Sequence, residues 1–136
     1  MSLIGFSFLS VNAKANSKVS NENVEIKIAP PVIDNIEKKD LSSLGITDSV
    51  KIDFKFATHY LPDFGEILLS GEVIYKVTDA EKFVKDWYGG KSDEKMIADI
   101  LNIIFKRCLL KVVELSDMLK LPPPVAFPAI MPASKE

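Results

Sequence analysis

Residues 50–77 read VKIDFKFATHYLPDFGEILLSGEVIYKV and carry the clearest structural pattern in the chain. Apolar and polar side chains alternate on both sides of Leu61-Pro62-Asp63-Phe64-Gly65, which has the proline and glycine of a short hairpin loop. Alternation with a period of two places the apolar side chains of a strand on one face. The stretch therefore predicts an antiparallel hairpin with one buried face and one solvated face.

Two further strands are predicted before the hairpin. In residues 4–15 the large side chains occupy even positions up to Phe8 and odd positions from Leu9, which indicates a strand with a β-bulge at that step. Residues 24–28 alternate until Pro30-Pro31, which would stop a central strand. Residues 32–48 have a mixed pattern, so we expect an irregular crossover or an edge segment there.

Two helices are predicted after the hairpin. Thr78 to Glu81 has the spacing of a capping box, and apolar side chains follow at helical intervals up to Gly89-Gly90. A long helix then begins at Ser92 or Asp93 and runs to about residue 121, where three prolines end it. We expect an extended tail after it.

The predicted fold class is α+β, with a four-stranded antiparallel sheet packed by a short helix and a long C-terminal helix. The length fits a single domain over residues 1–136, with a proline-bearing tail from about residue 122.

The long helix is apolar on more than one side. One stripe, which would cover the sheet, consists of Ile97, Leu101, Ile104, Phe105, Cys108, Val112, Leu115 and Leu119. A second set points away from it: Met96, Ile103, Leu109, Leu110 and Val113. Leaving that set in water would forgo several kcal/mol in a domain stable by roughly 5–15 kcal/mol. We therefore expect an oligomer interface there, while a tail that folds back and a wholly intramolecular core are the alternatives.

The composition argues against several classes of function. Lys and Arg number 17 against 19 Asp and Glu, so the chain has no basic footprint for nucleic acid or for an anionic membrane. No apolar run is long enough to cross a bilayer, and the apolar opening residues lack the basic leader of a signal peptide. The single cysteine, Cys108, fits a reducing compartment, so we expect a cytoplasmic protein.

No set of residues in the sequence is typical of catalysis. His59 is the only histidine and falls on the polar face of a predicted strand, where a solvated position is expected. Asp63 and Glu66 flank the hairpin loop and could form an acid pair, although loop carboxylates are usually solvated. Gly89-Gly90-Lys91-Ser92 lacks the first glycine and the preceding strand of a phosphate loop. We expect no metal, no cofactor and no enzymatic activity.

Two stretches and the order of the elements point to a known family. Asn102-Ile103-Ile104-Phe105, followed by Arg107, is similar to an Asn-Ile-Leu-Phe-Pro-Tyr-x-Arg segment, and LPPPVAFPAI at residues 121–130 is similar to a Pro-Pro-Ile-x-Leu-Pro-x-Ile tail. In these features the chain resembles the bacterial protein-export chaperone SecB and its SecB-like relatives. It departs from them at Lys106, which replaces the Pro-Tyr pair, in the helix over 79–88, and in lacking a strongly acidic surface.

The resemblance implies a homo-oligomer that holds unfolded polypeptides in apolar grooves without nucleotide, as a homotetramer built from two dimers. The candidate groove residues are Phe6, Phe8, Phe64, Trp87, Tyr88 and Phe127. The first hypothesis is thus an ATP-independent holdase chaperone for unfolded polypeptides or preproteins, active in protein transport and export. The alternative is an oligomeric adaptor that docks one folded partner, and a third hypothesis is a binder of small apolar ligands between sheet and helix.

Overall fold

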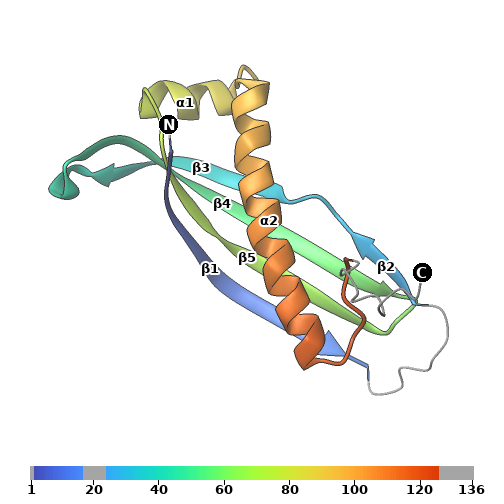
Figure 1. Ribbon diagram of the computed structural model, residues 1–136. Coiled ribbons are helices and arrows are strands. Elements are labelled where there is room, and N and C mark those ends of the chain that lie inside the picture. The colour runs from blue at the N-terminus through green and yellow to red at the C-terminus, as the bar shows by residue number, and fades with distance from the viewer. Residues whose placement is uncertain (1, 17–23, 126–136) are drawn as a thin grey trace, which may run out of the picture.

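The computed structural model describes residues 2–16 and 24–125, which form one antiparallel sheet with two helices on one of its faces (Figure 1). The strands are β1 (Ser2–Ala15), β2 (Glu25–Ile28), β3 (Val32–Leu41), β4 (Ile46–Leu61) and β5 (Gly65–Lys76). A short 3-10 helix, η1 (Ser42–Leu44), joins β3 to β4, and the helices are α1 (Ala80–Tyr88) and α2 (Glu94–Met118). The α+β class and the antiparallel sheet are confirmed.

The sheet has five strands in four rows, so the predicted count of four is wrong by one. The order is β1-β5-β4-β2, and β3 pairs with β4 on the same side as β2. Ile28 lies opposite Thr58 and Val32 lies opposite Lys55, so β2 and β3 together form one outer row. The break in that row is Ala29-Pro30-Pro31, because proline cannot donate a hydrogen bond to the ladder.

The predicted hairpin and the predicted bulge are both confirmed. Residues from Ser49 to Tyr60 of β4 pair with residues from Lys76 to Gly65 of β5. In β1 the register shifts between Phe8 and Ser10, which leaves Leu9 as the extra residue. The shift lets apolar side chains before and after the bulge face the helices, as the change of alternation in the sequence requires.

Both helices begin at aspartate caps. Asp79, and not Thr78, caps α1, and its side chain accepts from the Lys82 backbone N–H. The predicted capping box over Thr78 to Glu81 is therefore wrong, because the third residue after the cap is Lys82, which has no carboxylate to accept from the cap N–H. The Ala80 N–H donates to the Asp48 carboxylate at 3.1 Å. For α2 the cap is Asp93, which is one of the two predicted starting residues.

The core-facing row of α2 turns around the helix along its length. Its buried residues recur every fourth position: Ile100, Ile104, Cys108, Val112 and Ser116. A four-residue ridge is inclined to the helix axis and fits the twist of the sheet below it. The straight stripe predicted from the sequence therefore missed Ile100 and Ser116. Met96, assigned to the outward set, instead precedes Ile100 in this row and packs against the core.

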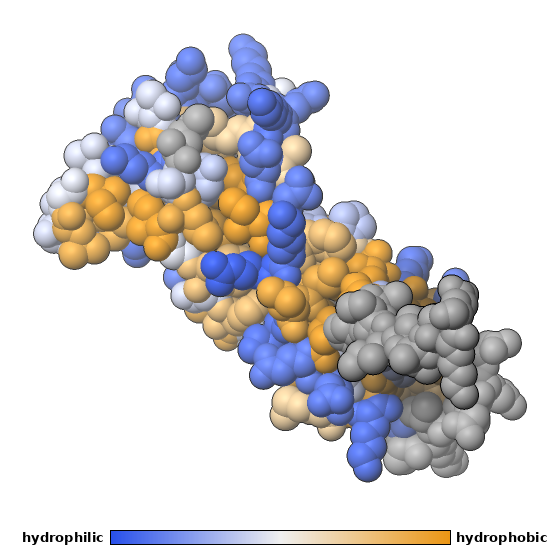
Figure 2. Space-filling view, viewed as in Figure 1, coloured by the Kyte–Doolittle hydropathy of each residue, from blue (hydrophilic) through white to orange (hydrophobic). Residues whose placement is uncertain are grey.

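The remaining residues of α2 fall into three rows defined by their distance from the buried row. The residues that follow the first four buried residues form the β2 flank: Leu101, Phe105, Leu109 and Val113. The residues that precede the last four form the β1 flank: Ile103, Arg107, Lys111 and Leu115. The outward ridge consists of Asn102, Lys106, Leu110, Glu114 and Met118, all of which are exposed. Figure 2 shows mainly hydrophilic side chains along the exposed side of α2, with hydrophobic surface beside them.

Candidate functional site

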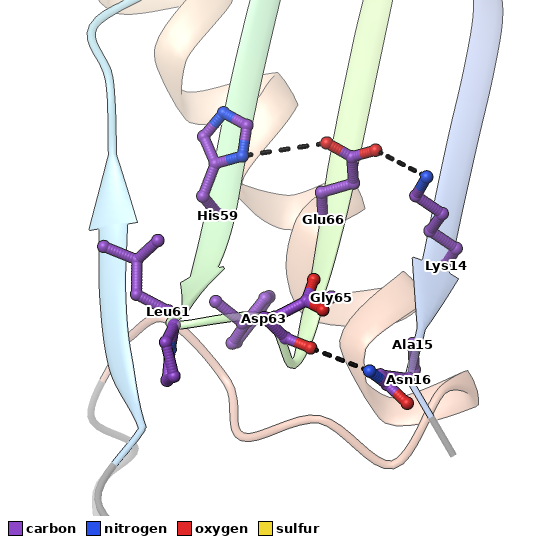
Figure 3. A pocket seen from close by; sticks show the side chains of 10 residues that line it. Lys14, Ala15, Asn16, His59, Leu61, Asp63, Gly65 and Glu66 are labelled. Atoms are coloured by element: carbon purple, nitrogen blue, oxygen red, sulfur yellow. Dashed lines mark hydrogen bonds and ion pairs between the residues drawn. The ribbon is translucent and has the colours of Figure 1, made fainter. Parts of the chain in front are cut away.

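A polar cleft of about 370 Å³ lies at the turn between β4 and β5 (Figure 3). The Glu66 carboxylate lies between two basic groups, with Lys14 Nζ at 3.0 Å and His59 Nδ1 at 3.8 Å. Asn16 Nδ2 donates to the backbone carbonyl of Asp63 at 3.1 Å. Glu66 is therefore ion-paired with Lys14 and lies near the His59 ring, and the His59 side chain is 43% exposed.

The residues that the structure describes contain no group of three or more His, Cys, Asp or Glu side chains that could hold a metal ion. Cys108 is fully buried on α2, and burial raises the pKa of its thiol to about 12. A thiol with that pKa stays protonated at neutral pH and is not a nucleophile. No helix in the described part of the chain is long and apolar enough to cross a membrane.

Two of the predicted groove residues come together on the helix side of the sheet. The ring centroids of Phe6 and Phe8 lie 5.1 Å apart, and that of Phe54 lies 5.1 Å from the first and 6.2 Å from the second. The β1 flank of α2 covers this aromatic cluster: Arg107 lies 5.5 Å from the Phe6 centroid and Lys111 lies 5.7 Å from that of Phe8. Both phenylalanines are half-buried beneath cationic side chains.

The other predicted groove residues lie elsewhere. Phe64 is half-buried in the turn between β4 and β5, and Trp87 is half-buried on α1. The Tyr88 ring is 60% exposed, but its hydroxyl accepts from the Ile36 N–H at 3.2 Å and donates to the Asn35 side chain, which ties α1 to β3. Phe127 lies outside the described residues. The described candidates thus occupy three separate places and do not form one groove.

The predicted interface residues differ widely in exposure. Leu110 is 70% exposed on the outward ridge, and Met118, two turns later and missed by the sequence analysis, is 72% exposed. Ile103 packs against the core from the β1 flank, and Leu109 and Val113 are half-buried on the β2 flank. The chain therefore buries more of the predicted interface residues than the helical wheel indicated.

An apolar hollow of about 380 Å³, which the sequence analysis missed, lies on the β2 flank of α2. Residues 28–31 and the α2 residues Leu101, Asn102 and Phe105 line it. The Phe105 ring centroid lies 5.8 Å from that of Phe56, so this wall of the hollow rests on the sheet. Because the two sides are some seventy positions apart in the sequence, only the Pro30-Pro31 break could have indicated the place.

The sheet face that the helices leave open carries a network of ion pairs. Lys51 Nζ lies 2.8 Å from Glu37, 3.8 Å from Asp53 and 3.9 Å from Glu72. The hydrogen bond from Lys51 lowers the pKa of Glu37, and the same contact raises the pKa of Lys51. The described acidic side chains Glu37, Asp53 and Glu72 thus share Lys51 as a partner on this face.

No family model matches the chain, and no curated protein matches it. A solved structure of the Mycobacterium tuberculosis Rv1957 SecB-like chaperone, in complex with a ChAD peptide from the Rv1956 HigA1 antitoxin, is similar to it. The two share 12% sequence identity, the match covers 96% of this chain and 91% of the other, and the TM-score is 0.53. The chain has a SecB-like fold. In the SecB-like fold of this chain, the β2-flank hollow and the aromatic cluster are the candidate binding surfaces.

Proposed function

We propose that the chain is an ATP-independent holdase that binds unfolded polypeptide segments on apolar surfaces of a SecB-like fold. The observation that carries the proposal is the likeness to a SecB-like chaperone over 96% of this chain, the similar protein having been solved with a peptide bound. The described residues support it because they include an apolar hollow in which apolar side chains of a client segment can be buried.

The β2-flank hollow is the best-placed surface for a client segment. Its lining from Ile28 to Pro31 and from Leu101 to Phe105 is mostly apolar, and it opens to solvent beside the exposed ridge of α2. Extended segments bind such grooves by placing alternate apolar side chains into them. Each buried apolar side chain contributes roughly 1.5–3 kcal/mol, so a few side chains suffice for reversible binding.

The proposed holdase is a homo-oligomer, either a dimer or a tetramer. Leu110 and Met118 leave large apolar side chains on the outward ridge, where a second copy of α2 would bury them. The predicted interface residue Ile103 belongs to the adjoining β1 flank, and a second ridge packed alongside would contact it. Leu109 and Val113 remain predicted interface residues, but they face the other flank.

Suppression of aggregation tests this function. The chain should prevent several unrelated enzymes from aggregating when they are heated, at near-stoichiometric ratios and without ATP, with light scattering as the measurement. Leu101→Asp, which places a carboxylate in the hollow, should weaken suppression several-fold. Ser43→Asp adds the same charge at an exposed position on η1 and should leave suppression unchanged. Equal suppression by both variants would show that the hollow does not bind the client.

A specific adaptor is the second candidate, because the similar structure contains a peptide from one named protein. An adaptor of this kind recognises one segment of one partner and ignores other unfolded chains. It would suppress the aggregation of none of the unrelated enzymes, even at excess. That result would favour the adaptor and overturn the general holdase.

A further inference from the structure

The β2 flank of α2 is an apolar row longer than the hollow at its start. Leu101 and Phe105 line the first hollow, and a second hollow of about 300 Å³ near the end of α2 is lined by Val113, Ser116, Leu121 and Pro123, with two acidic residues at its rim. Half-buried Leu109 lies between them, one helical turn from each neighbour in the row. Together the two hollows and the row form what we term the β2-flank trough.

The strand side of the trough does not suit an added β-strand. Pro30 and Pro31 line it between β2 and β3 and have no N–H to donate. An occupant is therefore held by side-chain packing and needs no ladder of hydrogen bonds. A proline-rich segment, which cannot form such a ladder either, matches this surface.

The chain itself enters the trough at the end of α2. The Leu121 N–H donates to the Ser116 carbonyl at 2.8 Å, the Leu121 side chain is buried, and Pro123 lines the second hollow. Figure 1 shows the last described residues turning from the end of α2 toward β2. Residues 126–136, AFPAIMPASKE, continue from this point.

The length and composition of this segment match the trough. From Val113 back to Leu101 the helix rises about 18 Å at 1.5 Å per residue. The seven residues of 126–132 span about 22 Å in an extended polyproline conformation at 3.1 Å per residue. They carry no charge and contain Phe127, Ile130 and Met131, while the charged Lys135 and Glu136 follow them.

We propose that residues 126–132 lie in the β2-flank trough as a built-in ligand that client polypeptides must displace. The part about clients rests on the proposed function, whereas the docking of the tail stands independently of it. A tethered segment has an effective concentration in the millimolar range, so even a weak intrinsic affinity keeps the trough occupied. The apparent association constant for a client is then the intrinsic constant multiplied by the fraction of time for which the trough is empty.

Disulfide trapping tests the docking of the tail. With Asn102→Cys at the far end of the trough and Ile130→Cys in the tail, oxidation should give an intramolecular disulfide at a rate independent of protein concentration. The control pairs Ile130→Cys with Asp99→Cys, which is exposed and precedes buried Ile100, so that it lies on the side of α2 away from the trough. Native Cys108 is buried and should not compete. Faster trapping of the 99 pair, or disulfides only between chains, would overturn the proposal.

Client binding tests the competition. A chain that ends at Val125 and the full-length variant Phe127→Asp should both bind an unfolded apolar client peptide several-fold more tightly than the unaltered chain, by fluorescence anisotropy. The control, Lys135→Ala, should not change the affinity. Unchanged affinity in the truncated chain would overturn the competition. If no form of the chain binds the peptide, the holdase proposal fails, while the disulfide result still decides whether the tail docks.

Discussion

Gly71 lies on β5 opposite Phe8 of β1. A Cβ at this position would lie 2.1 Å from the Ser7 carbonyl oxygen and 2.8 Å from Cζ of Phe54. The aromatic cluster of Phe6, Phe8 and Phe54 therefore depends on the missing side chain. We expect Gly71→Ala to lower the free energy of unfolding by about 1–3 kcal/mol, the usual cost of overpacking, as measured by urea denaturation.

Gly5 provides the matched control on the neighbouring strand. A Cβ there would have Ile74 Cγ1 at 3.7 Å as its nearest contact, which is an ordinary packing distance. Gly5→Ala should change the free energy of unfolding by no more than about 0.5 kcal/mol. An equal loss in both variants would show that the close contacts of position 71 with Ser7 and Phe54 do not set the cost.

At the scale of elements, Tyr88 connects α1 to β3. Its hydroxyl accepts from the N–H of Ile36, a buried residue, and donates to Asn35. Tyr88→Phe leaves that N–H without its partner, so we expect a loss of about 1–3 kcal/mol in the free energy of unfolding. Hydrogen exchange of the α1 amides should become faster while that of β4 and β5 changes less. Equal protection of α1 in both proteins would show that other contacts hold the helix.

The elements that the sequence predicted are those with a strict period over many residues. The hairpin of β4 and β5 alternates through buried positions such as Ile52 and Val73, so its two strands and their antiparallel pairing were predicted. β3 was not recognised as a regular strand because it lies at the edge, where only Ile33 and Ile36 contact the core and residues 37–40 are charged. Edge strands have one paired neighbour and little buried surface, so their pattern is weak.

The candidate binding surfaces were predicted only in part. Phe6 and Phe8, aromatic residues on a strand, lie together beneath α2, and their part in a binding groove stays a prediction. The β2-flank trough was not found, because its two sides are far apart in the sequence. The outward face of α2 was misjudged at Met96, since a flat helical wheel does not represent a buried row that turns with the twist of the sheet.

At the scale of the whole molecule, assembly is expected to depend on Leu110. Replacing this exposed residue of the outward ridge by aspartate should lower the molar mass measured by light scattering during size exclusion to that of one chain. The circular dichroism spectrum should not change, because Leu110 does not belong to the core. Ser43→Asp, at an exposed position on η1 away from the ridge, adds negative charge without removing an apolar side chain and should leave the mass unaltered. An unchanged mass for Leu110→Asp would exclude this ridge as an interface.

The two margins of the sheet are unequal. The outer row of β2 and β3 is broken at Pro30-Pro31, so it cannot template a long partner strand. β1 instead runs from Ser2 to Ala15 without proline. Growth of this sheet by strand addition is therefore one-sided. If two copies paired through β1, both unbroken edge strands would be paired and no unbroken edge would remain for a third copy. The break at Pro30-Pro31, which also lines the trough, therefore opposes polymerisation into fibres.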